Sequence, residues 1–314
     1  MSAFAAVCAA HAPLALHSAT VAPQKDEYLS SLKKCGDWVR DFSPDLVVEF
    51  APDHFNGFFY NVMPNFCIGT GATSVGDWAT NTGPLNVPSD IAMEALKFAR
   101  KSDVDCDLSY SMQVDHGFTQ ILELMFGSID AYPVIPIMIN CAAPPRPAFR
   151  RVRLLGEVIG RYFRQTDLRV LFLGSGGLSH DPPMVNIEDA SEAQRRMLIG
   201  DKPWSTDARK ARENRVVSAA IDFATGKETG SRHPNPQWDC DFMDLMKSGN
   251  IAAADGWTDE TLTEVAGCGG HEVRTWVASF AAMQAATGTY AMDVDYYEIV
   301  TAWMTGMGVV RACG

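Results

Sequence analysis

Three stretches near the beginning of the chain decide its fold class: FAAVCA at residues 4–9, KDEYLSSLKKCGDWVRDF at residues 25–42 and LVVEFA at residues 46–51. The first and third are short apolar runs with little polar alternation, which is typical of strands that are covered on both faces. The second has its large apolar residues near one stripe of a helix. A strand, a helix and a second strand in this order predict an α/β protein with parallel strands.

The alternation of apolar runs and helical spacing continues along the rest of the chain. Further strands are predicted at residues 134–139 and 170–173, and further helices at residues 89–100, 148–163, 207–224 and 271–285. Ser89 and Ser205 are predicted helix N-caps, because an acid follows each in the first turn. No linker, repeat or low-complexity segment divides the chain, so we expect a single catalytic domain over residues 1–314. Its central sheet should be mostly parallel or mixed, with helices on both faces.

The composition excludes several classes of protein. The chain has 26 Lys and Arg residues against 38 Asp and Glu residues, and its net charge of −12 would repel a nucleic acid. Hydrophobic residues make up 47% of the chain, but no apolar run approaches the roughly 20 residues that a membrane span needs. Eight cysteines without a C-x-x-C pair indicate a reducing compartment, and the N-terminus does not resemble a signal peptide. We therefore expect a cytoplasmic enzyme or small-molecule-binding protein.

Histidines follow the predicted strands more often than a random placement would give. His11 and His54 come directly after the first two strands, and His180 follows the last one through the sequence GSGGLS. His116, which is preceded by Asp115, follows another extended-looking stretch. In a parallel sheet the working residues lie just beyond the carboxyl ends of the strands. The sequence therefore predicts that these four histidines lie near one site.

Two imidazoles and one carboxylate can occupy one face of a metal ion and leave three positions open, as in non-haem Fe(II) oxygenases. His11 and His54 are the natural imidazoles, because they end neighbouring predicted strands. Glu272 is the preferred carboxylate, because the glycines of GCGG at residues 267–270 would let the backbone approach a crowded site. Asp53 is the rival, although an acid adjacent to a ligand more often orients that ligand than binds the metal.

The residues alone leave plainer alternatives open. A histidine at a strand end is more often a core or hydrogen-bonding residue, and Glu272 is also explained as a first-turn acid favoured by the helix dipole. The glycine run at residues 174–177 lacks the ending of a P-loop and the spacing of a dinucleotide-binding loop, and Ser175 does not lie in a G-x-S-x-G elbow. We interpret these glycines as a sharp turn that delivers His180 to the site.

Four stretches carry a resemblance to a known enzyme family. They are SPDLVVEFAPDHFNGFFYNVMPNFCIGTGATSVGD (43–77), MQVDHGFTQ (112–120), VLFLGSGGLSHDPP (170–183) and HEVRTWVASFAA (271–282). Over nearly its whole length the chain resembles the 2,3-dihydroxyphenylpropionate (2,3-dihydroxycinnamate) 1,2-dioxygenases. These are class III extradiol ring-cleaving enzymes, which belong to the superfamily of the protocatechuate 4,5-dioxygenase catalytic subunit.

The resemblance implies roles for five side chains of this sequence. His11, His54 and Glu272 would hold Fe(II), and His116 and His180 would be the pair that transfers protons. We assign His116 as the proton donor and His180 as the acceptor, although sequence does not fix the direction. The implied reaction is extradiol cleavage by O2 of a 3-substituted catechol such as 3-(2,3-dihydroxyphenyl)propionate or 2,3-dihydroxycinnamate. It would give a hydroxy-oxo-dienedioate in the degradation of aromatic and phenylpropanoid compounds.

The sequence departs from the family pattern in two places. Ala12 stands where a serine is expected, and residues 296–303 lack a proline and an acid that are expected before Trp303. Neither change touches the implied iron ligands, but the second bears on the side chain of the substrate if that segment borders the pocket. No particular basic residue stands out in the sequence as the partner of the substrate carboxylate.

Three other functions remain as alternatives. The chain could act on a different catechol or an aminophenol, it could be a non-catalytic scaffold relative, or the same donor set could hold zinc in a hydrolase. The expected partners are a catecholic small molecule and O2, with no nucleic acid and no membrane. We expect a homo-oligomer, in which the apolar C-terminal segment at about residues 288–314 lies at the interface.

Overall fold

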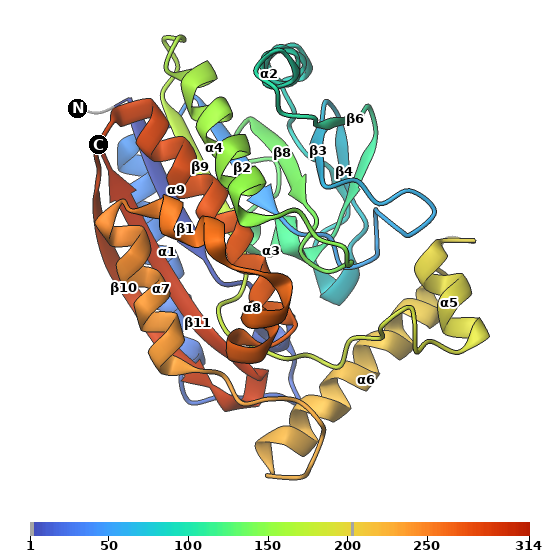
Figure 1. Cartoon of the computed structure of the whole chain (residues 1–314). Coiled ribbons are helices and arrows are strands. Elements are labelled where there is room, and N and C mark those ends of the chain that lie inside the picture. Colours follow the sequence, from blue (N-terminus) through green and yellow to red (C-terminus); the bar gives the residue numbers. More distant parts are fainter. Residues whose placement is uncertain (1–2, 202–203) are drawn as a thin grey trace.

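The computed structural model describes residues 3–201 and 204–314, and its centre is a mixed β-sheet (Figure 1). The strands of this sheet are β1 (Phe4–Ala9), β2 (Leu46–Ala51), β3 (Phe66–Gly69), β6 (Asp107–Ser109), β8 (Val134–Ile139), β9 (Val170–Ser175), β10 (Ala291–Val300) and β11 (Thr305–Cys313). Their spatial order is β10-β11-β1-β9-β2-β8-β3-β6. The neighbours β1, β9, β2 and β8 run parallel, whereas β11 and β3 pair antiparallel with β1 and β8. The predicted fold class is confirmed.

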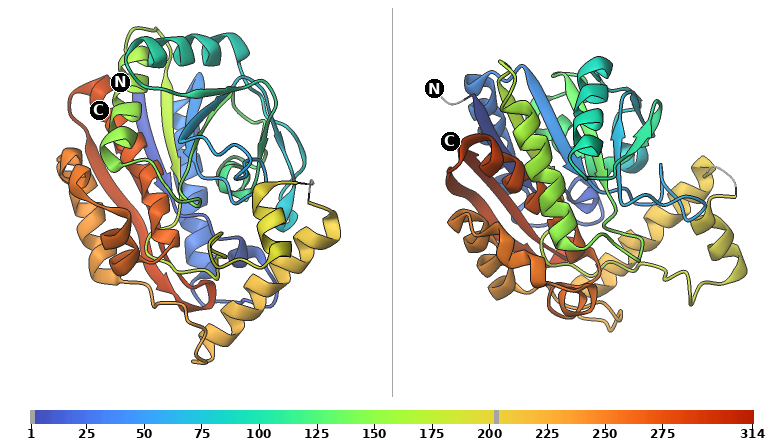
Figure 2. Two further views of the ribbon diagram at one scale, coloured as in Figure 1. Left: turned by 45° about the vertical axis from the view of Figure 1, so that its right-hand side comes forward. Right: turned by 45° about the horizontal axis from the view of Figure 1, so that its top comes forward.

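Helices cover both faces of the sheet, as Figures 1 and 2 show. They are α1 (Lys25–Phe42), α2 (Ser89–Lys101), α3 (His116–Phe126), α4 (Phe149–Phe163), α5 (Glu192–Ile199), α6 (Thr206–Ala224), α7 (Pro236–Ser248), α8 (Asp259–Ala266) and α9 (Val273–Thr287). The core under α4 and α9 takes one face, and the core under α1 and α3 takes the other.

Burial on both faces explains why the central strands are apolar throughout. Successive side chains of a strand point to opposite faces of the sheet. On β1, Phe4 and Cys8 enter the core under α4 and α9, whereas Ala5 and Val7 enter the core under α1 and α3. A strand with water on one face would alternate apolar and polar residues, and this one has no polar residue at all.

Most of the predicted elements have their expected bounds. The strands at residues 4–9, 46–51 and 134–139 and the helix at residues 25–42 match β1, β2, β8 and α1, and the strand at 170–173 extends to Ser175. The Ser205 side chain caps α6 by accepting a hydrogen bond from the backbone N–H of Ala208, as predicted. The prediction for Ser89 is wrong. The carbonyl of Pro88 accepts the first helical hydrogen bond, from Ala92, so Pro88 is the N-cap and Ser89 is already helical.

The C-terminal segment completes the sheet of its own chain. Strands β10 and β11 form an antiparallel hairpin, and β11 pairs with β1. Residues 305–310 are buried by this pairing and by the layers above and below. Most of the apolar surface that suggested an oligomer interface therefore packs inside the chain. An oligomer interface at about residues 288–314 stays a prediction.

Two smaller elements stand beside the main sheet. One is a second sheet of order β5-β4-β7, with strands β4 (Ala72–Ser74), β5 (Gly83–Pro84) and β7 (Met112–Val114). The other is the pair α5 and α6, which we call the helical arm and which extends away from the body in Figures 1 and 2. Backbone hydrogen bonds from Tyr60 and Asn61 to the carbonyls of Leu198 and Ile199 attach the arm to the body. Among the described residues, no helix is both long enough and apolar enough to cross a bilayer.

Candidate active site

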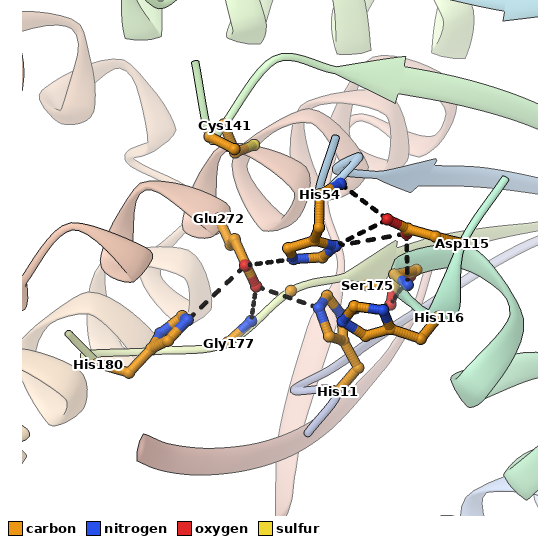
Figure 3. A network of polar contacts seen from close by, with 12 residues as sticks. His11, His54, Asp115, His116, Cys141, Ser175, Gly177, His180 and Glu272 are labelled. Carbon is orange, nitrogen blue, oxygen red and sulfur yellow. Dashed lines mark hydrogen bonds and ion pairs between the residues drawn. The ribbon is translucent and has the colours of Figure 1, made fainter. Parts of the chain in front are cut away.

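The carboxyl ends of adjacent parallel strands bring the predicted site residues together (Figure 3). His11 follows β1, His54 follows β2, and the loop to His180 follows β9, which lies between those two strands. Glu272 reaches the same place from η4 (Gly269–Glu272), the short 3-10 turn that leads into α9. The topology therefore gathers groups that are up to 261 residues apart in the sequence, from His11 to Glu272.

Two imidazoles point at opposite oxygens of one carboxylate. His11 Nε2 lies 3.4 Å from Glu272 Oε2, and His54 Nε2 lies 3.1 Å from Glu272 Oε1. Ligands about 2.1 Å from a metal and about 90° apart lie about 3 Å from each other. The spacing and the chemistry of these three groups therefore fit a metal held by two histidines and one carboxylate.

Ser175 sets the tautomer of His11. The Ser175 hydroxyl donates to the carbonyl of Gly117 at 2.6 Å, so its single proton is already used. It must therefore accept the hydrogen bond that joins it to His11 Nδ1 at 3.1 Å, which places the proton of the imidazole on Nδ1. Burial lowers the pKa of His11 to about 3, so the ring is neutral at pH 7. His11 Nε2 thus presents a free lone pair to the centre.

Asp115 fixes the orientation of His54. Its carboxylate lies 3.3 Å from His54 Nδ1 and accepts a hydrogen bond from the backbone N–H of His54 at 2.8 Å. The same carboxylate caps α3 through the N–H of Gly117. Burial alone would lower the pKa of His54, but the charges of Asp115 and Glu272 outweigh burial and raise it. Without a metal, His54 therefore holds a proton that a metal ion would displace.

Glu272 is ionised in spite of its burial. Burial would raise the pKa of its carboxyl group, but His11, His180 and His54 lower it well below its ordinary value. The backbone N–H of Gly177 also donates to Glu272 Oε2 at 2.7 Å. A buried negative charge that faces imidazole nitrogens is suited to a divalent cation.

His116 lies on the His54 side of the centre. Its Nδ1 is 2.5 Å from Asp77 Oδ2, and its backbone N–H donates to Asp77 Oδ1 at 2.8 Å. Its ring stacks on the ring of His54, with centroids 4.3 Å apart. Nitrogen atoms of His11, His54 and His116 lie within 4.8 Å of one another, so His116 is also close enough to a bound metal to touch what the metal carries.

His180 lies on the Glu272 side of the centre (Figure 3). The carbonyl of Leu178 accepts a hydrogen bond from His180 Nδ1 at 2.8 Å, which places the proton of a neutral ring on Nδ1. Nε2 is 3.7 Å from Glu272 Oε1. Glycines make room for the ring. A Cβ on Gly269 would lie 2.1 Å from His180 Nε2, and one on Gly177 would lie 2.7 Å from His180 Cε1. The GSGG and GCGG runs therefore both serve the placement of His180.

The rival carboxylate, Asp53, serves another purpose. It does not line the cavity, and its oxygens accept hydrogen bonds from the backbone N–H groups of Gly57 and Phe58, which stabilises the turn after His54. Burial raises the pKa of Asp53 to about 7. This carboxyl group is therefore less suited than Glu272 to hold a cation.

All five predicted site residues line a cavity of about 350 Å³. Its walls include the histidines and Glu272 at one end and residues of the helical arm at the other. Trp303 and Thr305 also line it, so the segment around Trp303 borders the site. Residues 296–303, where the sequence departs from the family pattern, therefore touch the substrate space through Trp303.

Sequence reasoning did not find Asp77, the role of Ser175, or the arm. Ser175 drew attention only as a candidate nucleophile, and the bond that defines its role joins residues 164 positions apart. Asp77 has no motif of its own, although it ends one of the stretches that carried the family resemblance. A contact across the fold leaves no local pattern in a single sequence.

Comparisons with known proteins find one matching family and several similar proteins. The family described as the catalytic LigB subunit of aromatic ring-opening dioxygenase matches residues 5–308. A 2,3-dihydroxyphenylpropionate/2,3-dihydroxicinnamic acid 1,2-dioxygenase of Paraburkholderia phymatum is 48% identical over 272 residues, which cover 86% of this chain and 85% of that protein. Proteins of the same name from Rhodococcus jostii and Mycolicibacterium gilvum are 45% and 43% identical and cover 96% and 99% of this chain, and 96% and 98% of their own lengths.

Proposed function

The chain belongs to the LigB family of aromatic ring-opening dioxygenases, and from this premise we propose that it cleaves a 3-substituted catechol at an extradiol bond with Fe(II) and O2. The substrate would be 3-(2,3-dihydroxyphenyl)propionate or 2,3-dihydroxycinnamate, as the names of its relatives indicate. The product would be a hydroxy-oxo-dienedioate in the catabolism of aromatic compounds. The observation that carries the proposal is the convergence of His11 Nε2 and His54 Nε2 on the carboxylate of Glu272.

His11, His54 and Glu272 would hold the iron. Their donor set, two imidazoles and one carboxylate on one face, is the set that non-haem Fe(II) oxygenases use. Bound iron would supply adjacent open positions for the catechol oxygens and for O2, together with electron transfer between them. Ser175 and Asp115 would keep the two imidazole rings aimed at the iron, because each contacts the ring nitrogen that faces away from the metal-binding centre.

His180 suits the role of proton acceptor. The carbonyl of Leu178 holds the proton on Nδ1, so a neutral His180 has its lone pair on Nε2, toward the centre. Burial lowers the pKa of His180, but Glu272 and Leu178 outweigh that effect and raise it above its ordinary value. The neutral ring is therefore oriented to accept a phenolic proton at Nε2.

His116 suits the role of proton donor. Asp77 lies against Nδ1 and leaves Nε2 to face the cavity. A proton on Nε2 would then be placed to pass to a departing oxygen. The two histidines lie on different sides of the Glu272–His54 pair, so one can act on the catechol while the other acts elsewhere on the reacting atoms (Figure 3).

The decisive experiment loads the purified chain with Fe(II) without air and measures oxygen uptake and the absorbance of ring-fission products. A panel of 3-(2,3-dihydroxyphenyl)propionate, 2,3-dihydroxycinnamate, unsubstituted catechol, protocatechuate and 2-aminophenol separates the candidate substrates. We expect the first two to give the highest kcat/KM. No oxygen uptake with any compound would favour a scaffold, and activity that requires zinc would favour a hydrolase.

The free cysteines bear on the cellular compartment of the enzyme, and the edge strand β10 bears on its oligomeric state. All eight cysteines are free, which agrees with a reducing cytoplasm. We also propose that the chain forms a homo-oligomer through the exposed edge of β10, because an unpaired strand edge is a ready site for pairing. Light scattering of the purified chain measures the mass of the assembly, and a monomer would contradict this.

A further inference from the structure

Three arginines of α6 line the side of the cavity that the helical arm forms. Arg209, Arg212 and Arg215 follow one another at three-residue intervals, so successive members are neighbours on the helix, and all three belong to the cavity wall. Lys210, on the same helix, is exposed and does not line the cavity. The cationic face of α6 therefore points at the substrate space, in a protein whose net charge is −12.

Arg209 and Arg212 are half-buried and Arg215 is exposed, and these arginines lack the carboxylate partners that other arginines of the molecule have. Arg153 pairs with Asp255, and Arg274 pairs with Asp259. By contrast, none of the three α6 arginines forms an ion pair with a carboxylate within the parts of the chain that the structure describes. A guanidinium group at a cavity without a carboxylate in contact is ready to bind an anionic ligand.

Their hydrogen bonds are also incomplete. Arg212 Nη1 donates to the carbonyl of His54 at 2.6 Å, and Arg209 Nη1 donates to the carbonyl of Val75 at 3.3 Å. The Nε of Arg209 and the indole nitrogen of Trp204 are buried, and neither has a hydrogen-bond partner in the described chain. Since a buried donor without a partner is unfavourable, these atoms also favour a bound acceptor.

The acids nearby are engaged elsewhere. Glu213, which also lines the cavity, accepts a hydrogen bond from the backbone N–H of Trp78 at 2.9 Å. Asp77 and Asp115 face His116 and His54. Burial lowers the pKa of Arg212, and the more distant charges of Asp115, Asp53 and Asp77 offset this only in part. The partner that Arg212 lacks is an anion at contact distance.

The position of Arg212 relates this anion to the ring that is cleaved. Its guanidinium group bonds the backbone of His54, one of the residues that would hold the iron. A ligand whose ring oxygens lie at the centre would therefore lie close to the loop whose backbone Arg212 contacts. The lining of the same cavity also includes Phe55, Leu198 and Val216, which suit the carbon atoms of a short chain.

We propose that Arg209, Arg212 and Arg215 bind the carboxylate at the end of the substrate's side chain, and that this contact selects acidic 3-substituted catechols over neutral ones. The inference rests on the proposed function and names the residues that give it specificity. Paired N–H groups of arginine match the two oxygens of a carboxylate. A neutral catechol of equal length would leave the half-buried guanidinium groups of Arg209 and Arg212 without an anionic partner, and sites built for a hydrogen bond reject such analogues strongly.

The test compares 3-(2,3-dihydroxyphenyl)propionate with 3-propylcatechol, which has the same number of side-chain carbons and no charge. The proteins are the Fe(II)-loaded wild type, Arg212→Gln, Arg209→Gln and, as the matched control, Lys210→Gln, which removes one charge from the outer face of the same helix. We expect the KM for the acid to rise about 10- to 100-fold in R212Q and R209Q, and the KM for 3-propylcatechol to change by less than about threefold. K210Q should match the wild type with both substrates.

Two results would overturn the inference. One is an equal loss for both substrates in R212Q and R209Q at unchanged iron content, which would mean that the arginines only support the fold. The other is an unchanged KM for the acid in both variants, which would place its carboxylate elsewhere. Arg209→Gln matters here because Arg209 does not contact His54, so its effect is independent of the iron ligands.

A binding measurement separates this inference from the proposed reaction. Calorimetry on the metal-free chain compares 3-phenylpropionate with 3-phenylpropanamide, neither of which can be cleaved. We expect the wild type to bind the acid at least about tenfold more tightly than the amide, and R209Q to lose this preference. Equal binding of acid and amide by the wild type contradicts the arginine site. A preference for the acid, together with no cleavage of any catechol, would contradict the proposed reaction and leave the arginine site intact.

Discussion

The two ends of the cavity are built in opposite ways. At the strand end, each imidazole nitrogen that faces away from the centre has a partner, and these partners are Ser175, Asp115, Asp77 and the carbonyl of Leu178. At the arm end, Arg209 and Arg212 donate one hydrogen bond each, and the helix that carries them is largely exposed. The imidazole rings at the strand end are held by other groups of the protein, whereas the arginines at the arm end have N–H donors without a protein partner in the part of the chain that the structure describes.

This difference matches two different tasks. Metal binding and proton transfer need atoms held within a fraction of an ångström, which rigid strand ends and orienting hydrogen bonds provide. Recognition of a flexible side chain needs charge and reach more than fixed geometry, and exposed elements attached to a rigid body commonly supply these. The following predictions test whether the two ends are separable, from the largest expected effect to the smallest.

Removal of a metal-binding side chain should give the largest loss. In Glu272→Ala or His54→Ala the iron content should fall close to zero, and kcat should fall by more than the roughly 10⁴-fold limit of a single proton-transfer group. Metal analysis after anaerobic loading, together with oxygen uptake, measures both quantities. His17→Ala is the control, because His17 lies outside the cavity wall. A variant that kept its iron would exclude that residue as a ligand.

Removal of a proton-transfer group should lower turnover at constant iron content. We expect His116→Ala and His180→Ala to lower kcat by about 10²- to 10⁴-fold, because each removes one positioned acid or base. The KM for the substrate should change much less, since the iron and the arm still bind it. If either variant lost iron as completely as His54→Ala, that histidine would be a ligand, which the 4.8 Å grouping of His116 with His11 and His54 makes worth testing.

Asp77→Asn should show how strongly turnover depends on the orientation of His116. The amide keeps the shape of the side chain but loses the charge that faces His116 Nδ1 at 2.5 Å. Groups that orient active-site histidines are typically worth about 10- to 100-fold, so we expect a loss of that size in kcat with little change in KM. Asp130→Asn, at an exposed position, is the control. A rise in KM with unchanged kcat would place Asp77 with the recognition end instead.

The strand end was largely predictable from the sequence because its signals are local. Apolar runs such as residues 4–9 mark buried strands, and the rule that sites lie beyond carboxyl ends then selects His11 and His54. The family resemblance supplied the roles of Glu272, His116 and His180. The structure brings all five side chains together, and their roles stay predictions until the variants are measured.

The arm end was not predictable, and the reason is physical. On α6 the arginines alternate with other charged residues, and this pattern is also typical of a solvated helix. Only the packing of the arm against the loop after His54 makes a cavity wall of Arg209 and Arg212. The error at Ser89 has a similar origin, because the N-cap is set by which carbonyl receives the first helical hydrogen bond, here that of Pro88.

One carboxylate of the central sheet is an exception to the pairing seen at the histidines. Glu49 lies on β2, is completely buried, and neither of its side-chain oxygens has a hydrogen-bond partner in the described chain. Burial raises its pKa well above the ordinary value. Between the pKa of the unfolded chain, about 4.3, and the raised pKa of the folded state, folding requires Glu49 to keep a proton. The free energy of unfolding should therefore decrease as the pH rises through this window.

Glu49→Gln should remove this dependence, because an amide carries no charge at any pH. We expect the Tm of E49Q to match the wild type at about pH 5 and to exceed it by a few degrees at about pH 8, as measured by thermal unfolding of the metal-free chain. Glu264→Gln, at an exposed position, should show no such divergence. A lower Tm for E49Q at pH 8 would mean that the carboxylate is ionised and has a cationic partner. Glu49 would then be paired as the histidines at the edge of the sheet are, and the contrast with the arm would be sharper still.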